Sequence, residues 1–560
     1  MDVTVRKARS RFPMLVRKVH LYANTLRYLR FGQIVNRIWR RICRPISVPL
    51  VALTPRVISG LWVFPPTPAT SIVAPTTFRF LNVERICATD ADWQTGDASH
   101  LWLYNLHYFD DLNAVGAASR ASLHRELIGR WVRENPIGKG VGWEPYPTSR
   151  RIVNWVKWVM CGNNMSADGL VSLAIQSRWL VRRLEYHILG NHLLANAKAL
   201  VYAGLFFDGP EASHWFERGI DILDKQIREQ ILPDGGHFEL SPMYHAIVLE
   251  DLLDVVNCLR AYRREVSNDW LNKIAWMQHW LQAMIHPDGE IAFFNDAAFG
   301  IAQIPLELNA YSVRLGLQIE KDECEPVTVL NSSGYVRALI GRAYLVCDCA
   351  QIGPSYLPGH GHADTLSFEF SLDGKRVFVN SGTSVYGTDL ERHRQRGTAT
   401  HNTVVVDGEN SSEVWGGFRV ARRARAKLAC AALSANGERA LIDASHDGYR
   451  RLVGRVEHRR CWALNEHSLR IDDNLSGKFD RAEACFHLHP SVEVTVIGPS
   501  DIELSWSPSA IIRISFSGAA TVVVSDGTWH PEFGLTVTNK CISVKFSGTL
   551  LSTYMTWGQS

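Results

Sequence analysis

The sequence predicts a multidomain α+β protein with a helical N-terminal domain and an antiparallel β-sandwich after it. At 560 residues the chain is too long for a single hydrophobic core. Between about residue 100 and residue 320, apolar residues recur at helical spacing, whereas after Pro326 they alternate as in β-strands. We therefore expect a connector over 1–98, a helical domain over 99–325 and a β-sandwich over 326–560.

Composition and charge are those of an ordinary globular protein. The 60 Lys and Arg residues nearly balance 56 Asp and Glu residues, and 46% of the chain is hydrophobic, so we expect no nucleic-acid partner. The 11 cysteines show no paired metal-binding spacing, which favours free thiols over disulfides. The 18 tryptophans are many for this length and hint at stacking on sugar rings.

The first patterned stretch is a basic amphipathic helix over Tyr22–Ile42. Such a helix can make peripheral contact with an anionic membrane or cover an acidic partner. The alternative, which we favour at this stage, is a helix that caps the main domain with its arginines in solvent. No continuous apolar segment with a cleavage site follows the basic start of the chain, so we see no signal peptide. We expect a protein that is cytoplasmic or peripheral to the inner membrane.

A Pro-rich connector with short strands leads into the helical region. Examples of the expected helices are Asp111–Asn135, Ser149–Cys161, Asp168–Tyr186, His192–Phe207, Glu211–Gln230, Tyr244–Arg263 and Asn268–His286. Their similar lengths and short links suggest helical hairpins packed around an axis. The periodicity does not distinguish a toroid from an open solenoid.

Strands dominate the C-terminal region, with Asp-Gly and Asn-Gly turns between several of them. The expected strands are Tyr335–Cys349, Leu366–Phe370, Arg376–Val379, Thr403–Val406, Ala440–Asp443, Arg451–Leu464, Ser468–Asp472, Val492–Ile497, Ile511–Phe516, Ala520–Val524 and Ile542–Leu551. So many strands after the helices predict a large antiparallel sandwich.

A glycine-rich segment, Gly359–Asp364, stands where the strands begin. It carries His360 and His362 and precedes an alternating Leu-Ser-Phe-Glu-Phe run, which predicts a loop delivering polar side chains at the mouth of a strand. Taken alone, a His-x-His pair is more often hydrogen-bonded within a core than functional. The remainder of the chain changes that balance.

Two clusters in the helical region supply other chemistry. Gly190 marks a helix start that places Asn191 and His192 at the positive end of a helix, where an anion is favoured, although Asn191 is equally a plain helix cap. Tyr244 and His245 follow a tight turn into another helix. A buried structural tyrosine is the alternative there.

A polar, aromatic segment contains Trp143, Glu144 and Tyr146. It either lines a sugar-binding cleft or forms a helix cap with core aromatics. With the Asn, His and Tyr residues it suits β-elimination on a uronic acid, in which Asn and His stabilise the enediolate and His or Tyr moves protons. This chemistry requires no cofactor.

The motifs resemble those of the heparinase II/III-like polysaccharide lyases. The resemblance covers most of residues 100–420 and rests on Asn105–Phe109, Trp143–Tyr146, Gly190–His192, Tyr244-His245, Gly359–Asp364 and His401–Thr403. It implies an N-terminal incomplete α/α toroid followed by a C-terminal antiparallel β-sandwich. It also implies an anionic, uronate-containing polysaccharide as substrate.

The resemblance implies catalytic roles for four residues. Asn191 and His192 face the substrate carboxylate, with His192 a candidate base. Tyr244 is the acid, or acid and base both, and His360 is a further catalytic or orienting group. Candidate substrate-binding residues are Trp143, Glu144, Tyr146, His245, Arg394 and Arg396.

A structural zinc ion in the β-domain is also implied, at His362, Asn380 and His401. The family's middle ligand is typically Asp, and the neutral amide of Asn380 is a poorer zinc ligand. The N-terminus departs as well, because secreted members ordinarily carry a signal peptide, which makes the periplasm the family-based alternative location. The basic helix suggests a role in building cell-surface polysaccharide.

Two other functions stay open. Toroids also carry glycoside hydrolases, which need two carboxylates, and Glu144, Glu239 and Asp296 are candidates. A non-catalytic polysaccharide-binding protein would lack the Asn-His or Tyr positions, which are present here. The Asn380 replacement is the main feature in its favour.

Overall fold

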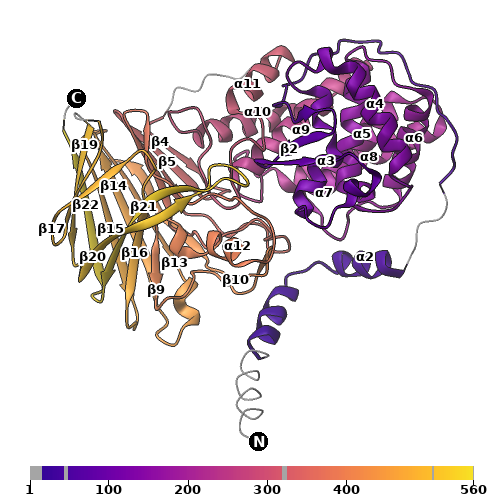
Figure 1. The fold of residues 1–560 in the computed structure, drawn as a ribbon. Coiled ribbons are helices and arrows are strands. Elements are labelled where there is room, and N and C mark those ends of the chain that lie inside the picture. Colours follow the sequence, from indigo (N-terminus) through magenta and orange to yellow (C-terminus); the bar gives the residue numbers. More distant parts are fainter. Residues whose placement is uncertain (1–15, 43–47, 318–324, 508–509, 559–560) are drawn as a thin grey trace, which may run out of the picture.

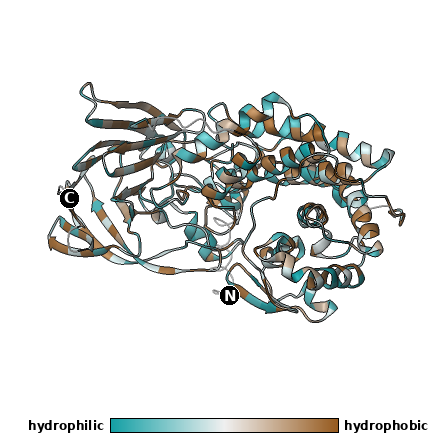
Figure 2. Cartoon of the chain, turned by 90° about the horizontal axis from the view of Figure 1, so that it is seen from above, coloured by the Kyte–Doolittle hydropathy of each residue, from teal (hydrophilic) through white to brown (hydrophobic). Residues whose placement is uncertain are grey.

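The computed structural model describes residues 16–42, 48–317, 325–507 and 510–558. A helical domain and a β-domain lie side by side, with the N-terminal helices outside both (Figure 1). Seen from above, the helices of the first domain form a ring (Figure 2). The predicted α/α toroid followed by an antiparallel sandwich is therefore confirmed, and the ring excludes the open solenoid.

The helices of the toroid are α3 (His100–Tyr108), α4 (Ala121–Glu134), α5 (Pro145–Met160), α6 (Ala167–Val181), α7 (Gly190–Phe206), α8 (Pro210–Gln230), α9 (Pro242–Ala261), α10 (Asn268–Ala283) and α11 (Pro305–Arg314). Proline occupies the first turn of α5, α8, α9 and α11, where its missing N–H costs nothing. Serine side chains cap α3, α6 and α9. Helices α3 and α11 lie within the region predicted to be helical, although their bounds were not predicted.

Before the toroid, residues 16–26 are helical and α2 (Phe31–Ile42) follows after a break. The single helix expected over Tyr22–Ile42 is thus two helices. A small sheet of β1 (Ile72–Ala74), β2 (Thr77–Phe80) and β3 (Val83–Ile86) then covers one edge of the toroid. Among the described residues, none of the helices combines the length and apolarity needed to cross a bilayer.

The β-domain contains three main antiparallel sheets. Five strands run in sequence order: β4 (Val327–Leu330), β5 (Tyr335–Ile340), β6 (Ala343–Asp348), β7 (Phe368–Leu372) and β8 (Lys375–Phe378). Eight form the order β12 (Ala426–Leu433), β13 (Arg439–His446), β14 (Glu457–Asn465), β15 (Ser468–Ser476), β22 (Leu550–Trp557), β19 (Ala510–Ser517), β18 (Asp501–Ser507), β17 (Glu493–Gly498). Four form the order β20 (Thr521–Trp529), β21 (Val537–Phe546), β16 (Ala482–His487), β9 (Val404–Val406).

Along the chain between β8 and β12 come α12 (Leu390–Gln395) and a ribbon of β10 (Val414–Trp415) and β11 (Arg419–Val420). The strand expected over Tyr335–Cys349 is a hairpin, because Gly341 adopts a positive φ of 56° and turns the chain between β5 and β6. The nine cysteines among the described residues are free thiols.

Two large cores and one smaller one hold the molecule together. The first fills the toroid and the second lies between the three sheets. The third joins the domains: Leu240 and Trp280 of the toroid pack with Tyr335 and Tyr344 of the five-stranded sheet. This apolar joint fixes the two domains against each other beside the functional residues.

Candidate active site

A cleft of about 1080 Å³ lies at the junction of the domains. Its toroid wall comes from α3, α5, α7 and α9, and its sandwich wall from loops that carry His360, Tyr386 and Phe418. The N-terminal helices add a third wall through residues that include Leu26 and Gln33. Segments far apart in the sequence therefore build one concave surface.

Aromatic rings line the toroid wall of the cleft. Tyr146 stacks on Tyr104 with ring centroids 6.4 Å apart and meets Tyr108 edge-on at 5.9 Å. The Arg150 guanidinium lies over Tyr108 and pairs with Asp110 at 3.1 Å. A wall of flat rings with a few charged groups is suited to sugar rings that carry acidic substituents.

Tyr244 lies in the first turn of α9, where the Ser241 hydroxyl accepts a hydrogen bond from its backbone N–H at 3.2 Å. Its hydroxyl is 2.9 Å from the Tyr386 hydroxyl, and its ring stacks on His360 with centroids 3.9 Å apart. Burial, together with Tyr386 and the carboxylate of Asp296, raises the pKa of Tyr244 well above its ordinary value. The phenol is therefore protonated and can donate a proton.

The start of α7 places Asn191 and His192 on the cleft wall. The chain reaches them through Leu189 and Gly190, both at positive φ, 72° and 58°. A Cβ atom at Gly190 would lie only 2.3 Å from the side chain of Leu357, so glycine is required there. A strained non-glycine residue next to such a position is a feature of functional sites.

His192 is held from behind by a buried carboxylate. Its Nδ1 is 3.2 Å from Glu185 Oε1, and Asn196 donates to the other Glu185 oxygen at 3.1 Å. Burial opposes protonation, but the charges of Glu185 and Glu239 outweigh it and raise the pKa of His192. This pairing orients Nε2 of the ring as the free nitrogen.

Several side chains on the sandwich side of the cleft bind to the Asp296 carboxylate. Arg392 donates to both of its carboxylate oxygens, one bond measuring 2.8 Å, and the two side chains are fully buried. His360 Nδ1 lies 2.8 Å from Oδ2 and His362 Nε2 lies 2.8 Å from Oδ1. Burial alone would raise the pKa of Asp296, but Arg392 and the histidines hold it well below the usual range. The ionised carboxylate thus fixes the orientation of both imidazoles.

Glu239 brings a second buried carboxylate to the cleft. It is 2% exposed, and Oε2 is 3.6 Å from His360 Nε2. Burial raises its pKa. Its carboxylate interacts electrostatically with both His192 and His360.

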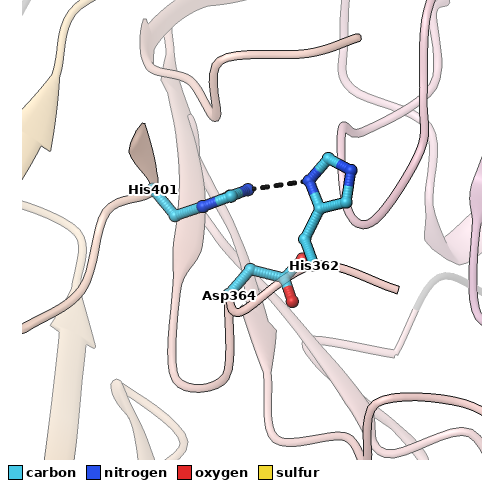
Figure 3. A group of neighbouring side chains, drawn as sticks. All are labelled: His362, Asp364 and His401. Atoms are coloured by element: carbon cyan, nitrogen blue, oxygen red, sulfur yellow. Dashed lines mark hydrogen bonds between the residues drawn. The ribbon is translucent and has the colours of Figure 1, made fainter. Parts of the chain in front are cut away.

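His362, Asp364 and His401 form a cluster with metal-ligand geometry (Figure 3). His362 Nδ1 and His401 Nε2 are 3.1 Å apart, and the potential ligand atoms of all three residues lie within 4.8 Å of one another. The other ring nitrogens face Asp296 and the Gly397 carbonyl, both at 2.8 Å, and these oxygens only accept.

The two facing nitrogens therefore carry lone pairs when the rings are neutral. Burial lowers the pKa of His362 to about 4 and that of His401 to about 3, so both rings are neutral near pH 7. Two lone pairs pointed at each other repel, and a Zn²⁺ ion bonded to both at about 2.0–2.1 Å would replace this repulsion by attraction. The residues present fit zinc, with the outward nitrogens already oriented.

The residues that could hold a metal ion differ from the set implied by the sequence resemblance. The amide of Asn380 donates to the Phe293 carbonyl at 2.8 Å and accepts from Asn402 N–H at 3.2 Å. The nitrogen and the oxygen of the Asn380 amide therefore both form hydrogen bonds with backbone groups. Asp364, rather than Asn380, supplies the carboxylate beside the two histidines.

The structure brings five of the predicted site residues to the cleft: Asn191, His192, Tyr244, His360 and Tyr146. Their catalytic and binding roles stay predictions. Glu144 lies behind the lining, where it pairs with His100 at 3.2 Å and accepts from the Tyr104 hydroxyl. It positions two lining residues.

The remaining four are placed elsewhere, and we no longer expect them to contact a substrate. Trp143 packs between Trp131 and Trp179 in the toroid core. His245 is fully buried and stacks on Trp280. These aromatic positions were expected in the cleft because sequence does not show which face of a helix a side chain occupies.

The two arginines serve the loops around the site. Arg396 is 1% exposed and donates to the carbonyls of Gly361 and Gly417, which orders the His360 loop. Arg394 pairs with Glu391 and donates to Thr528 at 2.6 Å on the outer surface. The basic residues of this segment therefore stabilise the loops around the site.

Sequence reasoning missed Tyr386 altogether and did not assign Glu185 a place in the site. Tyr386 follows Asn380 by six residues, and Glu185 precedes Asn191 by six residues. Their proximity along the chain was a usable signal. Asp296 had been considered as a carboxylate for the hydrolase alternative, and its central position became evident only from the contacts.

A toroid joined to a sandwich, with Asn, His and Tyr side chains converging at the joint, defines the two-domain class that the sequence motifs had suggested. Residues 107–311 match the model described as heparinase II/III N-terminus, and residues 324–556 match the model described as heparinase II/III-like, C-terminal. The chain belongs to the heparinase II/III-like family.

Two curated relatives are both named heparin-sulfate lyase. The protein from Bacteroides stercoris is 30% identical over 248 residues, which cover 40% of this chain and 37% of that protein. The protein from Pedobacter heparinus is 23% identical over 313 residues, which cover 50% and 47%. The chain thus matches less than half the length of these relatives.

Among solved structures, the crystal structure of heparinase III superposes with a TM-score of 0.72 at 17% identity. The superposition covers 97% of this chain and 90% of that one. At this identity the likeness establishes the fold, in which both domains and their arrangement are shared.

We predict that Asp296→Asn destabilises the protein, because Arg392 would keep its buried charge without a counter-charge. The expected loss in free energy of unfolding is about 3–5 kcal/mol. Urea denaturation followed by tryptophan fluorescence would measure it. The control is Asp221→Asn, which breaks an exposed pair with Lys225 and should change stability by less than about 0.5 kcal/mol. Equal effects of the two substitutions would show that the Asp296 carboxylate does not hold this side of the cleft together.

Proposed function

We propose that this protein is a polysaccharide lyase that cleaves a uronic-acid-containing polysaccharide by β-elimination. The observation that carries the proposal is the convergence of Asn191, His192, Tyr244 and His360 on one cleft at the domain junction. Membership of the heparinase II/III-like family and the names of the curated relatives support the same reaction class.

In the proposed reaction, His192 is the base. Its Nε2 takes the proton from C5 of the uronate, and the electron pair of that C–H bond forms the C4–C5 double bond. Asn191, at the N-terminus of α7, donates to the carboxylate and stabilises the charge that develops on it. The bond between C4 and the leaving oxygen breaks in the same elimination.

Tyr244 is the proposed acid. Its raised pKa keeps the phenol protonated, so it can deliver a proton to the leaving O4. Tyr386 shares a hydrogen bond with the Tyr244 hydroxyl at 2.9 Å and can hold it in place. His360, fixed through Asp296, stacks on the phenol and orients it toward the cleft. Every proton moved in this scheme passes through a side chain of the protein.

An anionic polymer is the partner that the cleft suits. Two exposed arginines line the cleft: Arg37 comes from the N-terminal helices and Arg419 from the sandwich. The walls formed by these two parts of the chain therefore each carry positive charge. These charges favour the approach of a polyanion. We propose a role in cell-surface polysaccharide metabolism at the inner membrane, with the periplasm as the family-based alternative.

The alternatives receive less support. A hydrolase would need an acid and a base among the carboxylates considered above, but the pKa of Asp296 is held well below the usual range by Arg392, and the oxygens of Glu144 are engaged by His100 and Tyr104. A non-catalytic binding protein does not account for a protonated phenol beside an oriented imidazole. Elimination uses both.

We also propose that His362, Asp364 and His401 hold a structural zinc ion in the β-domain. When bound, the ion would cross-link the His360 loop to the segment before β9. His362 reaches the same Asp296 carboxylate as His360, so the ion would stiffen the sandwich wall of the cleft.

Tyr244→Phe should abolish the elimination, because it removes the proposed proton donor while leaving the ring stacked on His360. A loss of at least about 100-fold in kcat is expected. The measurement is ultraviolet absorbance of the unsaturated product with a panel of uronate polysaccharides. Tyr554→Phe, at an exposed position of β22, is the matched control and should keep full activity. Cleavage without absorbance would point to hydrolysis instead.

Glu185→Gln tests His192 as the base. The amide can still accept from Nδ1, but loss of the negative charge removes an effect that raises the pKa of His192. The base must be deprotonated to act, so a lower pKa shifts the acidic limb of the kcat/KM profile to lower pH. Glu217→Gln, on the exposed face of α8, should leave the profile unchanged. An unmoved acidic limb in Glu185→Gln would argue for a different base.

Zinc analysis distinguishes the two ligand sets. The purified protein should hold about one zinc per chain, and chelation should lower its Tm. His401→Ala and Asp364→Asn should each weaken zinc binding by at least about 10-fold, whereas Asn380→Ala should retain the metal. Elemental analysis and competition with a chromogenic chelator provide the readout. Metal loss in Asn380→Ala with retention in Asp364→Asn would restore the set inferred from sequence.

A further inference from the structure

The N-terminal arm, defined as residues 16–42, packs on the body through its polar side. Gln33 is 2% exposed and donates to the carbonyls of Ile188 and Tyr356 at 3.3 and 3.4 Å. About two helical turns after Gln33, the Arg40 guanidinium contacts the His187 ring at 3.0 Å. The inward face of α2 is therefore the hydrophilic one.

The same arm reaches the sandwich. Trp415 of β10 donates to the Thr25 hydroxyl at 3.1 Å, and its ring meets Tyr22 edge-on with centroids 4.7 Å apart. Gln33 and Arg37 also line the cleft. The arm therefore spans both domains at the edge of the cleft, and the polar side of α2 forms part of the cleft wall.

The outward face of α2 is apolar and exposed. Its side chains recur at spacings of three and four residues, which places them on one stripe. The stripe consists of Phe31 (80% exposed), Ile34 (40%), Val35 (43%), Ile38 (54%), Trp39 (64%) and Ile42 (72%). In Figure 1, α2 lies outside the toroid, with no other element of the described chain drawn over its outer side. A helix that covers a core turns its apolar side inward, whereas α2 turns its apolar side outward. This corrects the favoured expectation that the helix caps the main domain with its arginines in solvent.

The charge around this stripe has one sign. Between Asp2 and Glu84 the sequence has no acidic residue, and residues 16–42 include seven basic ones: Arg17, Lys18, Arg27, Arg30, Arg37, Arg40 and Arg41. An apolar stripe containing Trp and Phe and flanked by arginine matches a helix that lies in the headgroup region of an anionic bilayer. A polyanionic sugar would satisfy the charges but not the apolar stripe.

We propose that the N-terminal arm docks the protein on the surface of an anionic phospholipid membrane, with α2 lying in the plane of the interface. The 12 residues of α2 span about 18 Å, which is shorter than the hydrocarbon core of about 30 Å, so the helix lies on the bilayer. Because the opposite side of the arm lines the cleft, docking holds the edge of the cleft at the membrane. This goes beyond the proposed lyase activity and does not depend on it.

Flotation of the full-length protein with vesicles tests the proposal. It should float with vesicles of phosphatidylcholine and phosphatidylglycerol, and much less with phosphatidylcholine alone or at high salt. Ile34→Glu combined with Ile38→Glu should reduce partitioning at least about tenfold, because it places two charges in the apolar stripe. Neither residue lines the cleft, so activity on soluble polymer, if present, should be unchanged.

Val453→Glu is the matched control, because Val453 is a fully exposed, isolated apolar residue in the β-domain. This variant should bind vesicles like the unaltered protein. Failure of the unaltered protein to float, or equal flotation of the stripe variant, would overturn the proposal. Light scattering supplies the competing outcome: a dimer that disappears in the stripe variant, without vesicle binding, would assign the stripe to a second copy of the chain.

Discussion

The charge of one buried aspartate holds the sandwich side of the cleft together. Asp296 lies in the toroid segment between α10 and α11, while Arg392, His360 and His362 come from the sandwich, so a single carboxylate accepts hydrogen bonds across the domain boundary. A buried ion pair of this kind contributes little net stability compared with apolar packing, but it tolerates few alternative geometries. The apolar joint around Trp280 and Tyr335 brings the domains together, and Asp296 sets the rotation of the imidazoles within that joint.

The two walls of the cleft use the same physical device. On the toroid wall Glu185 stands behind His192, and on the sandwich wall Asp296 stands behind His360, in each case a buried carboxylate that fixes the ring nitrogen facing away from the cleft. The electrostatic outcomes differ. Asp296 is neutralised by Arg392, whereas Glu185 adds its charge to that of Glu239 near His192. In the proposed reaction this difference suits His360 as an orienting group and His192 as the base.

The sequence predicted the fold class because helical and strand periodicities are local properties, and the boundary between them is sharp after Pro326. It predicted the His360 loop and the start of α7 because glycine punctuation marks them. It could not place Trp143 or His245, since the face of a helix that looks into a ring depends on the packing of its neighbours. It also could not show Asp364 beside His401, because 36 residues lie between them in the sequence and only the fold brings them into contact. The outward orientation of the α2 stripe likewise depends on polar contacts to Ile188 and Tyr356, far along the chain.

The order of strands in the largest sheet affects when the cleft can form during synthesis of the chain. Strand β22 lies between β15 and β19, in the interior of the eight-stranded sheet, rather than at its edge. During synthesis, therefore, β15 and β19 have no hydrogen-bonded neighbour between them until the chain has been made as far as Trp557. The toroid, with its own core, can form first. A nascent chain would carry the toroid wall without a stable sandwich wall, so the cleft would be completed only when synthesis is nearly finished.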